Sequence, residues 1–262
     1  MSCFRDKTVL ITGGSSGIGL ATAHRLHEEG ARLILLARDQ EKLARAACEV
    51  GKGVKHFSAD VADIQALRKV TEALDEPVDI LINNAGITRP GNFLELPEEC
   101  FQQMLDVNYL GAVNLTRLIL PSMLERGGGR LVFVSSLLGL MGVWGYSAYS
   151  ASKFAIRGFA ECLRTEFKPR GIEVTICYPP DTDTPQHEFE KPLLPPETVA
   201  QAGTAGLLSA DYVAEQLVQG ISKGKFHVVP GTQAKFIDVA NRLVPSVVHA
   251  FIDRDARQAR PD

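Results

Sequence analysis

Short apolar runs alternate with stretches of helical periodicity along most of this chain. The runs are rich in Val, Ile and Leu and shorter than a typical helix, as expected of strands buried on both faces of a parallel sheet. They predict strands at residues 7–12, 32–37, 54–58, 78–82, 130–135, 172–178 and 226–229. The helical stretches between them imply right-handed crossovers. We therefore expect an α/β fold: a single Rossmann-type, doubly wound parallel sheet of about seven strands, with helices on both faces.

The C-terminal end of the chain has a different pattern. Apolar residues recur there at steps of three or four, which predicts an amphipathic helix that Pro245 should kink or divide. The stripe contains Phe236, Ala240, Leu243, Val247 and Phe251, with Ile237, Val244, Val248 and Ile252 at its sides. We expect a main domain over residues 1–230 and an amphipathic extension over 231–262. The extension packs against its own domain or another subunit, or it contacts an anionic membrane surface through residues 235–257.

Residues 131–152 carry no charged side chain and are numerous enough to span a bilayer. Glycines, serines and Tyr149 interrupt the segment, however, and its first part matches a buried strand. We interpret it as a strand, a loop and the start of a helix.

Composition narrows the class of protein. The net charge is −3 and no basic stripe is visible, which argues against nucleic-acid binding. The five cysteines are scattered without metal-ligand spacing, so we expect reduced thiols and no metal. Charged residues Arg5, Asp6 and Lys7 precede the first strand, which argues against a signal peptide. We expect a cytoplasmic protein, or one bound peripherally at the cytoplasmic face of a membrane.

A glycine-rich turn follows the first predicted strand and precedes a helical stretch. It has the spacing Gly-x-x-x-Gly-x-Gly, and we expect its residues Gly13, Ser15, Ser16, Gly17, Ile18 and Gly19 to bind phosphate. Free N–H groups and the helix dipole favour an anion at such a turn. The turn also fits Gly-x-Ser-x-Gly, the nucleophile elbow of hydrolases, with Ser15 as nucleophile. Neither His187 nor His227 stands in a setting that supports this alternative.

The end of the second predicted strand carries Arg38, and Lys42 follows four residues later. Cations at this point of a Rossmann sheet suit the 2′-phosphate of NADP, whereas a carboxylate would bind the ribose of NAD. Asp39 lies between them and is a competing ribose ligand. We expect NADPH.

Amides and small residues end the fourth predicted strand, at Asn84, Ala85 and Gly86. They allow close approach of the backbone and a cofactor. Asn108 follows within a helical stretch, where asparagine is unfavourable on propensity alone, so we expect it to have a functional role.

Tyr149 and Lys153 are four residues apart, which places them one turn apart on one helix face. An ammonium near a phenol favours the phenolate and eases proton transfer. Ser136, thirteen residues before the tyrosine, follows a predicted strand. Together these residues indicate general acid–base chemistry.

These motifs resemble the short-chain dehydrogenase/reductase family from residue 7 to about residue 230. The resemblance implies that Ser136, Tyr149 and Lys153 form a catalytic triad, and that Asn108 completes a proton relay through a water. It also implies reduction of a ketone with NADPH, whose adenine would lie beside Asp60 and Val61. Further cofactor contacts are expected at Pro179, Thr182 and Thr184. The remaining alternative is a catalytically silent cofactor-binding regulator.

Within the family, three segments resemble the 3-ketosphinganine reductases: 13–17, 148–158 and 178–185. The resemblance implies a long-chain ketone substrate, 3-ketosphinganine, and a place in sphingolipid biosynthesis; 3-oxoacyl, steroid and short-chain ketone reductases are the alternatives. Apolar residues near the reacting carbon (Leu137, Leu138, Leu140, Met141, Val143 and Trp144) and a mobile cover at about 185–208 would suit a lipid. A homodimer or homotetramer is expected.

Overall fold

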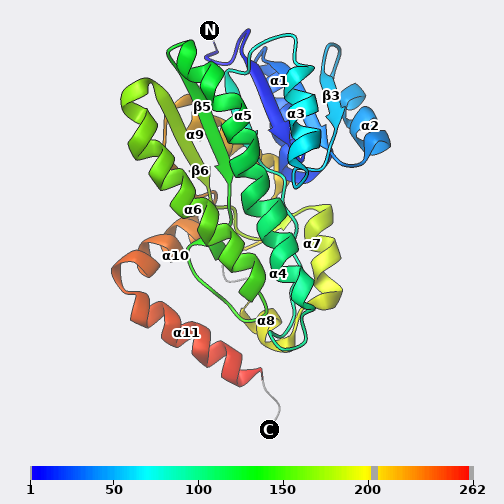
Figure 1. Cartoon of the computed structure of the whole chain (residues 1–262). Helices are drawn as coiled ribbons and strands as arrows, with labels where there is room; N and C mark the ends of the chain where they lie inside the picture. Colours follow the sequence, from blue (N-terminus) through cyan, green and yellow to red (C-terminus); the bar gives the residue numbers. More distant parts are fainter. Residues whose placement is uncertain (1, 202–205, 260–262) are drawn as a thin grey trace.

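The fold is centred on a seven-stranded parallel sheet with the strand order β3-β2-β1-β4-β5-β6-β9 (Figure 1). The computed structural model describes residues 2–201 and 206–259. The strands are β1 (Thr8–Thr12), β2 (Arg32–Ala37), β3 (Lys55–Ser58), β4 (Ile80–Asn83), β5 (Gly129–Val134), β6 (Ile172–Cys177) and β9 (His227–Val228). All seven lie where the sequence predicts them, so the predicted fold class is confirmed.

Helices cover both faces of the sheet because neighbouring strand residues point in opposite directions. Leu10 and Leu81 belong to one apolar cluster, with residues of α3 (Ile64–Glu72), α5 (Gly111–Glu125) and α6 (Ser147–Phe167). Ile11 and Ile82 belong to a second cluster, with residues of α1 (Gly17–Glu28), α2 (Gln40–Val50) and α9 (Ala210–Ser222). Helices therefore cover both faces of the sheet, as the sequence predicts.

The strand order reverses direction between β1 and β4, which are hydrogen-bonded neighbours. Crossovers leave β1 toward β2 on one side and β4 toward β5 on the other. Loops at the carboxyl ends of these two strands therefore diverge and leave a crevice, the usual ligand site of such sheets.

The segment after β4 contains a local irregularity. Helix α4 (Glu98–Leu105) runs into a π-helical turn, η1 (Asp106–Leu110), before α5 begins at Gly111. Single π-turns inside helices are frequent at functional sites. Asn108 lies within this one.

The expected cover at 185–208 is mainly helical over its described part. It contains α7 (Pro185–Glu190), a 3-10 turn η4 (Lys191–Leu193) and α8 (Pro196–Gln201), whereas residues 202–205 lie outside the described residues. A two-stranded sheet that the sequence analysis did not predict joins β7 (Thr182–Asp183) to β8 (Leu208–Ser209). It ties the two ends of the segment together.

The C-terminal extension consists of two helices, α10 (Thr232–Leu243) and α11 (Pro245–Gln258), so Pro245 divides it as predicted. They lie beyond one end of the sheet, with α11 beside α8 (Figure 1). Within residues 2–201 and 206–259, none of the helices is both long and apolar enough to cross a bilayer.

Candidate active site

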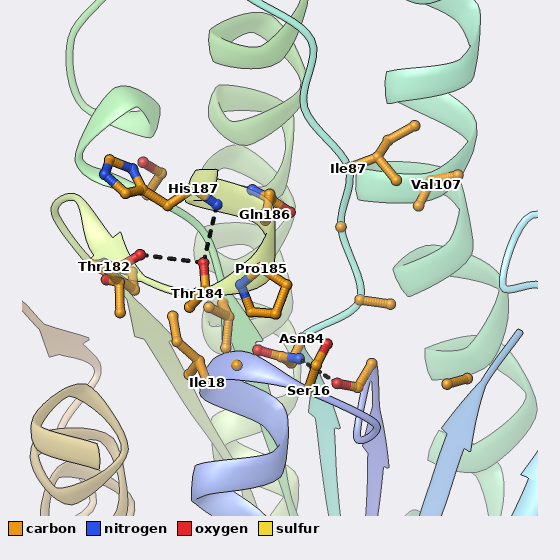
Figure 2. Close-up of a pocket in the computed structure, with 18 of the residues that line it drawn as sticks. Ser16, Ile18, Asn84, Ile87, Val107, Thr182, Thr184, Pro185, Gln186 and His187 are labelled. Carbon is orange, nitrogen blue, oxygen red and sulfur yellow. Dashed lines mark hydrogen bonds between the residues drawn. The ribbon is translucent and has the colours of Figure 1, made fainter. Parts of the chain in front are cut away.

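A pocket of about 410 Å³ opens at the carboxyl ends of the strands. It collects nearly all of the predicted site residues: Gly13, Ser15, Ser16, Gly17, Ile18, Arg38, Lys42, Asp60, Val61, Asn84, Ala85, Gly86, Ser136, Tyr149, Lys153, Pro179, Thr182 and Thr184. Gly19 and Asn108 do not line the pocket. Gly19 lies directly behind Gly13 and Asn84, and Asn108 lies directly behind Gly86. Figure 2 shows Ser16 and Ile18 of the glycine turn facing Thr184 and Pro185 at the start of α7.

The glycine turn requires glycine for two physical reasons. Gly13 and Gly17 have φ of 69° and 54°, a region that other residues rarely adopt. A Cβ on Gly19 would lie 2.3 Å from the Gly13 oxygen, so Gly19 allows the helix to pack beneath the turn. Helix α1 begins at Gly17, which directs its first N–H groups and its positive dipole end toward the pocket.

Asn84 joins the glycine turn to the end of β4. Its Nδ2 donates to the backbone oxygens of Thr12, at 3.0 Å, and Gly13, at 3.3 Å. The Thr12 hydroxyl accepts in return from the N–H groups of Asn84 and Ala85, each at 3.0 Å. This network fixes the floor of the pocket where β1 and β4 separate.

At the far end of the pocket, Asp39 has a structural role that the sequence analysis did not assign. Its carboxylate accepts the N–H of Lys42 at 3.0 Å and caps the N-terminus of α2. The largely exposed Arg38 guanidinium lies 3.9 Å from the Asp60 carboxylate. Arg38 and Lys42 therefore form a cationic corner with two nearby acids, of which Asp39 is engaged in the helix cap.

Asn108 clamps the loop after β4 to α6. Its Oδ1 accepts the Ile87 N–H at 2.8 Å, and its Nδ2 donates to the Ile87 oxygen at 3.0 Å and to the Ser152 hydroxyl at 2.9 Å. The π-helical turn directs this buried amide inward. The expected water relay from Asn108 to Lys153 stays a prediction.

Ser136, Tyr149 and Lys153 meet where β5 ends beside α6. The Lys153 ammonium donates to the Val134 oxygen at 3.1 Å and lies 5.5 Å from the centre of the Tyr149 ring. Burial lowers the pKa of Lys153 to about 8. Ser136 accepts the Leu138 N–H at 3.2 Å and also hydrogen-bonds to the Tyr149 side chain. The three side chains can therefore act on one reacting group.

The surroundings of the Tyr149 phenol favour its protonated form. Burial, followed by the charge of Glu190, raises its pKa well above the ordinary value, and this outweighs the opposing hydrogen bonds from Ser136 and Gln186. The sequence analysis expected the nearby ammonium to favour the phenolate. Burial and the charges of Glu190 and Asp181 dominate instead, which suits Tyr149 to the role of proton donor.

Four pocket residues near Tyr149 were missed by the sequence analysis: Tyr146, Asp181, Gln186 and Glu190. The Tyr146 hydroxyl donates to Glu190 Oε2 at 2.5 Å, and Gln186 Nε2 donates to Glu190 Oε1 at 3.4 Å. Burial raises the pKa of Glu190. For Gln186 and Glu190, the spacing of four residues on the short helix α7 was the available sequence signal.

The apolar residues expected beside the reacting carbon divide into two groups. Leu137 and Leu140 pack in the main core, Met141 is also buried, and Val143 packs in the cluster that contains Tyr149; these four do not line the pocket, and their contact with a substrate stays a prediction. Leu138 lines the pocket. The Trp144 indole donates to Asn92 at 2.8 Å, which holds the loop before α6.

The carboxyl ends of the strands therefore carry an anion-binding turn beside a buried proton donor. This combination is typical of a Rossmann-fold oxidoreductase. The family model described as short chain dehydrogenase matches residues 7–192, and the chain belongs to that family. The enzyme therefore acts on a ketone or CH–OH group, and the interpretation of Ser15 as a hydrolase nucleophile is wrong.

Two curated relatives have high similarity. The 3-dehydrosphinganine reductase of Danio rerio is 44% identical, with 83% of this chain and 69% of the relative covered. The 3-ketodihydrosphingosine reductase of Bos taurus is 41% identical over 84% and 69%. Among solved structures, L-sorbose reductase from Gluconobacter frateurii, complexed with NADPH and L-sorbose, has a TM-score of 0.76 and 28% identity. That alignment covers 89% of this chain and 99% of the other.

Proposed function

We propose that this protein reduces 3-ketosphinganine to sphinganine with NADPH, a step of sphingolipid biosynthesis. The observation that carries the proposal is the identity of 41–44% to reductases of that name over more than four-fifths of the chain. The gathering of Ser136, Tyr149 and Lys153 in one pocket supports it.

The pocket fits a nicotinamide dinucleotide. Gly13 and Gly17 make a cradle with positive φ that side chains would strain, and the N-terminus of α1 offers its N–H groups to a pyrophosphate. Arg38 and Lys42 would hold the 2′-phosphate, and Asp60 and Val61 the adenine. When bound, the cofactor supplies hydride to the ketone carbon.

The chain's own side chains supply the proton and the charge stabilisation. Ser136 donates a hydrogen bond to the ketone oxygen as negative charge develops there. Tyr149 delivers its proton to that oxygen. Lys153 lies beside the ring and stabilises the tyrosinate that forms, which offsets the burial cost of this anion.

A competition assay tests the substrate. Purified protein with NADPH is given 3-ketosphinganine, a 3-oxoacyl thioester and a small ketone, and kcat/KM is measured for each. We expect the highest value for 3-ketosphinganine. Preference for the thioester would favour the 3-oxoacyl reductase alternative. One solved neighbour, a putative betaketoacyl-ACP reductase, is 29% identical to this chain.

We further propose that α10 and α11 dock the enzyme on a membrane surface. Their exposed apolar side chains, called here the C-terminal apolar face, are Phe236, Val239, Leu243, Val244, Val247 and Phe251. Lys235, Arg242, Arg254 and Arg257 lie on the same two helices and suit anionic headgroups. An enzyme at the bilayer would take up a membrane-bound ketone without extracting it through water.

The extension also contacts the segment between Ser136 and Tyr149. Asn241 Nδ2 donates to the Leu140 oxygen at 2.9 Å. Gln201, which accepts the Trp144 N–H at 3.0 Å, donates to the Ile252 oxygen of α11 at 3.0 Å. The C-terminal apolar face therefore lies on helices joined to the catalytic loop. The expected homodimer or homotetramer and the cytoplasmic location stay predictions.

A further inference from the structure

One carboxylate in the active-site pocket has no role in the reaction described above. Glu190 is half-buried at the end of α7, with its Oε2 fixed by the Tyr146 hydroxyl at 2.5 Å. The Tyr146 ring lies 5.8 Å from the Tyr149 ring, centre to centre. The Tyr146 side chain therefore connects Glu190 to the proton donor, Tyr149.

The environment of Glu190 is unfavourable to its own charge. Burial is the main cause, and the charge of Asp181 adds repulsion; together they outweigh the hydrogen bonds from Tyr146 and Gln186 and the attraction of His187. Among the described residues, no cation is close enough to form an ion pair with its carboxylate. Glu190 and Asp181 both act on the Tyr149 phenol and hold its proton more firmly. A carboxylate that is partly desolvated without a cation gains from any ligand that brings one.

The pocket separates its charges. Arg38 and Lys42 lie at the glycine-turn end of the dinucleotide cradle, whereas Glu190 and Asp181 lie beside Tyr149. Lys153 is engaged with the Val134 oxygen. The end where the ketone reacts is therefore the acidic end.

We propose that Glu190 is a specificity-determining residue that binds a substrate ammonium on the carbon next to the reacting ketone. The inference rests on the proposed function, because 3-ketosphinganine carries its amine on the carbon beside its carbonyl. With the ketone oxygen at Tyr149, an ammonium on the next carbon would lie at the end of the pocket that Glu190 also lines. The ion pair satisfies the carboxylate and orients the carbonyl for hydride transfer.

The same carboxylate disfavours competing substrates. A 3-oxoacyl thioester has no cation beside its ketone, so binding it would bury the Glu190 carboxylate further without supplying a cation, with only the hydrogen bonds from Tyr146 and Gln186 retained. A site whose buried charged group is left without a partner rejects such an analogue strongly. Glu190 thus selects for an amino ketone over a neutral one.

The test compares two ketones that differ only in the amine. These are 3-ketosphinganine and 1-hydroxyoctadecan-3-one, presented in the same detergent micelles to the full chain with NADPH. In Glu190→Gln, the amide keeps the volume and still accepts from Tyr146. We expect kcat/KM for the amino ketone to fall about 10- to 100-fold, whereas kcat/KM for the neutral ketone should stay the same or rise because the charge that disfavours it is gone.

Two further variants control for structure. Glu188→Gln lies on the same helix, outside the pocket, where Glu188 pairs with Lys191 at 2.5 Å, and should leave both substrates unchanged. Glu190→Asp keeps the charge and should recover part of the preference for the amino ketone. NADPH binding, measured by fluorescence titration, should be equal in all variants.

The outcomes separate the two proposals. If the wild-type enzyme turns over neither long-chain ketone but reduces another class, the proposed function fails. If it reduces 3-ketosphinganine and Glu190→Gln loses the same factor on both ketones, the function stands and the assignment of Glu190 is overturned. Equal wild-type kcat/KM for both ketones would overturn it as well.

Discussion

Two tyrosines share the active-site pocket, and only their surroundings separate their roles. Burial raises the pKa of both phenols above the ordinary range. Tyr146 donates to Glu190, whereas Tyr149 is hydrogen-bonded to Ser136 and lies beside Lys153. A ketone oxygen held by Ser136 therefore meets the Tyr149 proton.

Tyr149→Phe should lower turnover about 10²- to 10⁴-fold, because it removes the positioned acid and keeps the ring volume. NADPH binding should be retained, as fluorescence titration would show. Tyr146→Phe is the matched control and should retain turnover within about tenfold. Equal losses in the two variants would contradict the assignment of the proton donor to Tyr149.

Lys153 trades stability for function. Its pKa is lowered from 10.5 to about 8 by burial, so the folded enzyme binds fewer protons than the unfolded chain between these pH values. The free energy of unfolding therefore rises with pH across this window. At pH 7 the enzyme carries the full cost of a buried ammonium.

We expect Lys153→Met to abolish turnover and to raise the free energy of unfolding at pH 7 by about 1–2 kcal/mol. This figure is the pKa difference converted to energy, less the lost hydrogen bond to Val134. The difference in free energy of unfolding between Lys153→Met and wild type should shrink as pH rises from 8 to 10.5, because wild type becomes more stable over this range. Urea denaturation at both ends of that range measures it, with the exposed Lys52→Met as control. A variant less stable than wild type at pH 7 would refute the argument.

At the scale of elements, we expect the short connection from β2 to α2 to set the cofactor preference. Arg38 directly follows β2, and Asp39 caps α2 by accepting the Lys42 N–H. The cap directs one carboxylate oxygen at α2, and the Arg38 side chain extends into the pocket. Cation and acid are adjacent in sequence but have different partners.

Arg38→Leu should weaken NADPH binding about tenfold or more and leave NADH nearly unchanged, because a charge-assisted bond to the 2′-phosphate is lost. Asp39→Ala should instead lower stability by about 1 kcal/mol through the lost cap, with the ratio of NADPH to NADH affinity kept. Isothermal titration calorimetry of each variant with NADPH and with NADH measures the two affinities and so distinguishes the two effects. Selective loss of NADH binding in Asp39→Ala would identify Asp39 as the ribose ligand.

Elements formed by strong local patterns could be predicted, and those formed by tertiary contacts could not. Buried strands such as β1 and β5 are visible as apolar runs, and Pro245 marks a helix boundary by its missing N–H. The pairing of β7 with β8 joins residues 26 positions apart over two residues each, which leaves no periodicity to detect. The π-turn at Asn108 likewise has no sequence signature.

The site follows the same division. The glycine turn, Tyr149 and Lys153 have fixed local spacings, so the sequence predicted them. Glu190 contributes because α7 folds back over the pocket, and the sequence offers only an acidic residue on a short helix. Leu137 and Leu140 pack in the core instead of lining the pocket, because the direction of the backbone decides which way an apolar loop residue points.

At the scale of the whole molecule, the C-terminal apolar face is the main unexplained surface. Phe236 and Leu243 are 74% and 75% exposed, and Phe251 is 53% exposed. Contiguous apolar residues on a protein surface mark a contact with a partner or a membrane. The same helices are anchored from within, because Ala234 and Asp238 are buried and Asp238 faces His227 at 3.2 Å.

Because of this anchoring, substitutions test the surface better than truncation after Gly231, which would also remove core contacts. The triple variant Phe236→Glu, Leu243→Glu and Phe251→Glu changes only exposed positions. We expect the wild-type chain to float with liposomes containing anionic lipid, and the triple variant to stay in the soluble fraction with turnover of a micellar substrate retained. Tyr212→Glu on α9, which alters an exposed aromatic outside the face, should float like wild type.

Ionic strength separates the two contributions to binding. Headgroup attraction is screened by salt, whereas apolar insertion is not. Flotation that weakens but persists at high salt would fit insertion of the apolar face aided by Lys235 and Arg257. If wild type does not float and the triple variant changes its oligomeric state in analytical ultracentrifugation, a second copy of the chain covers the face and the membrane proposal fails.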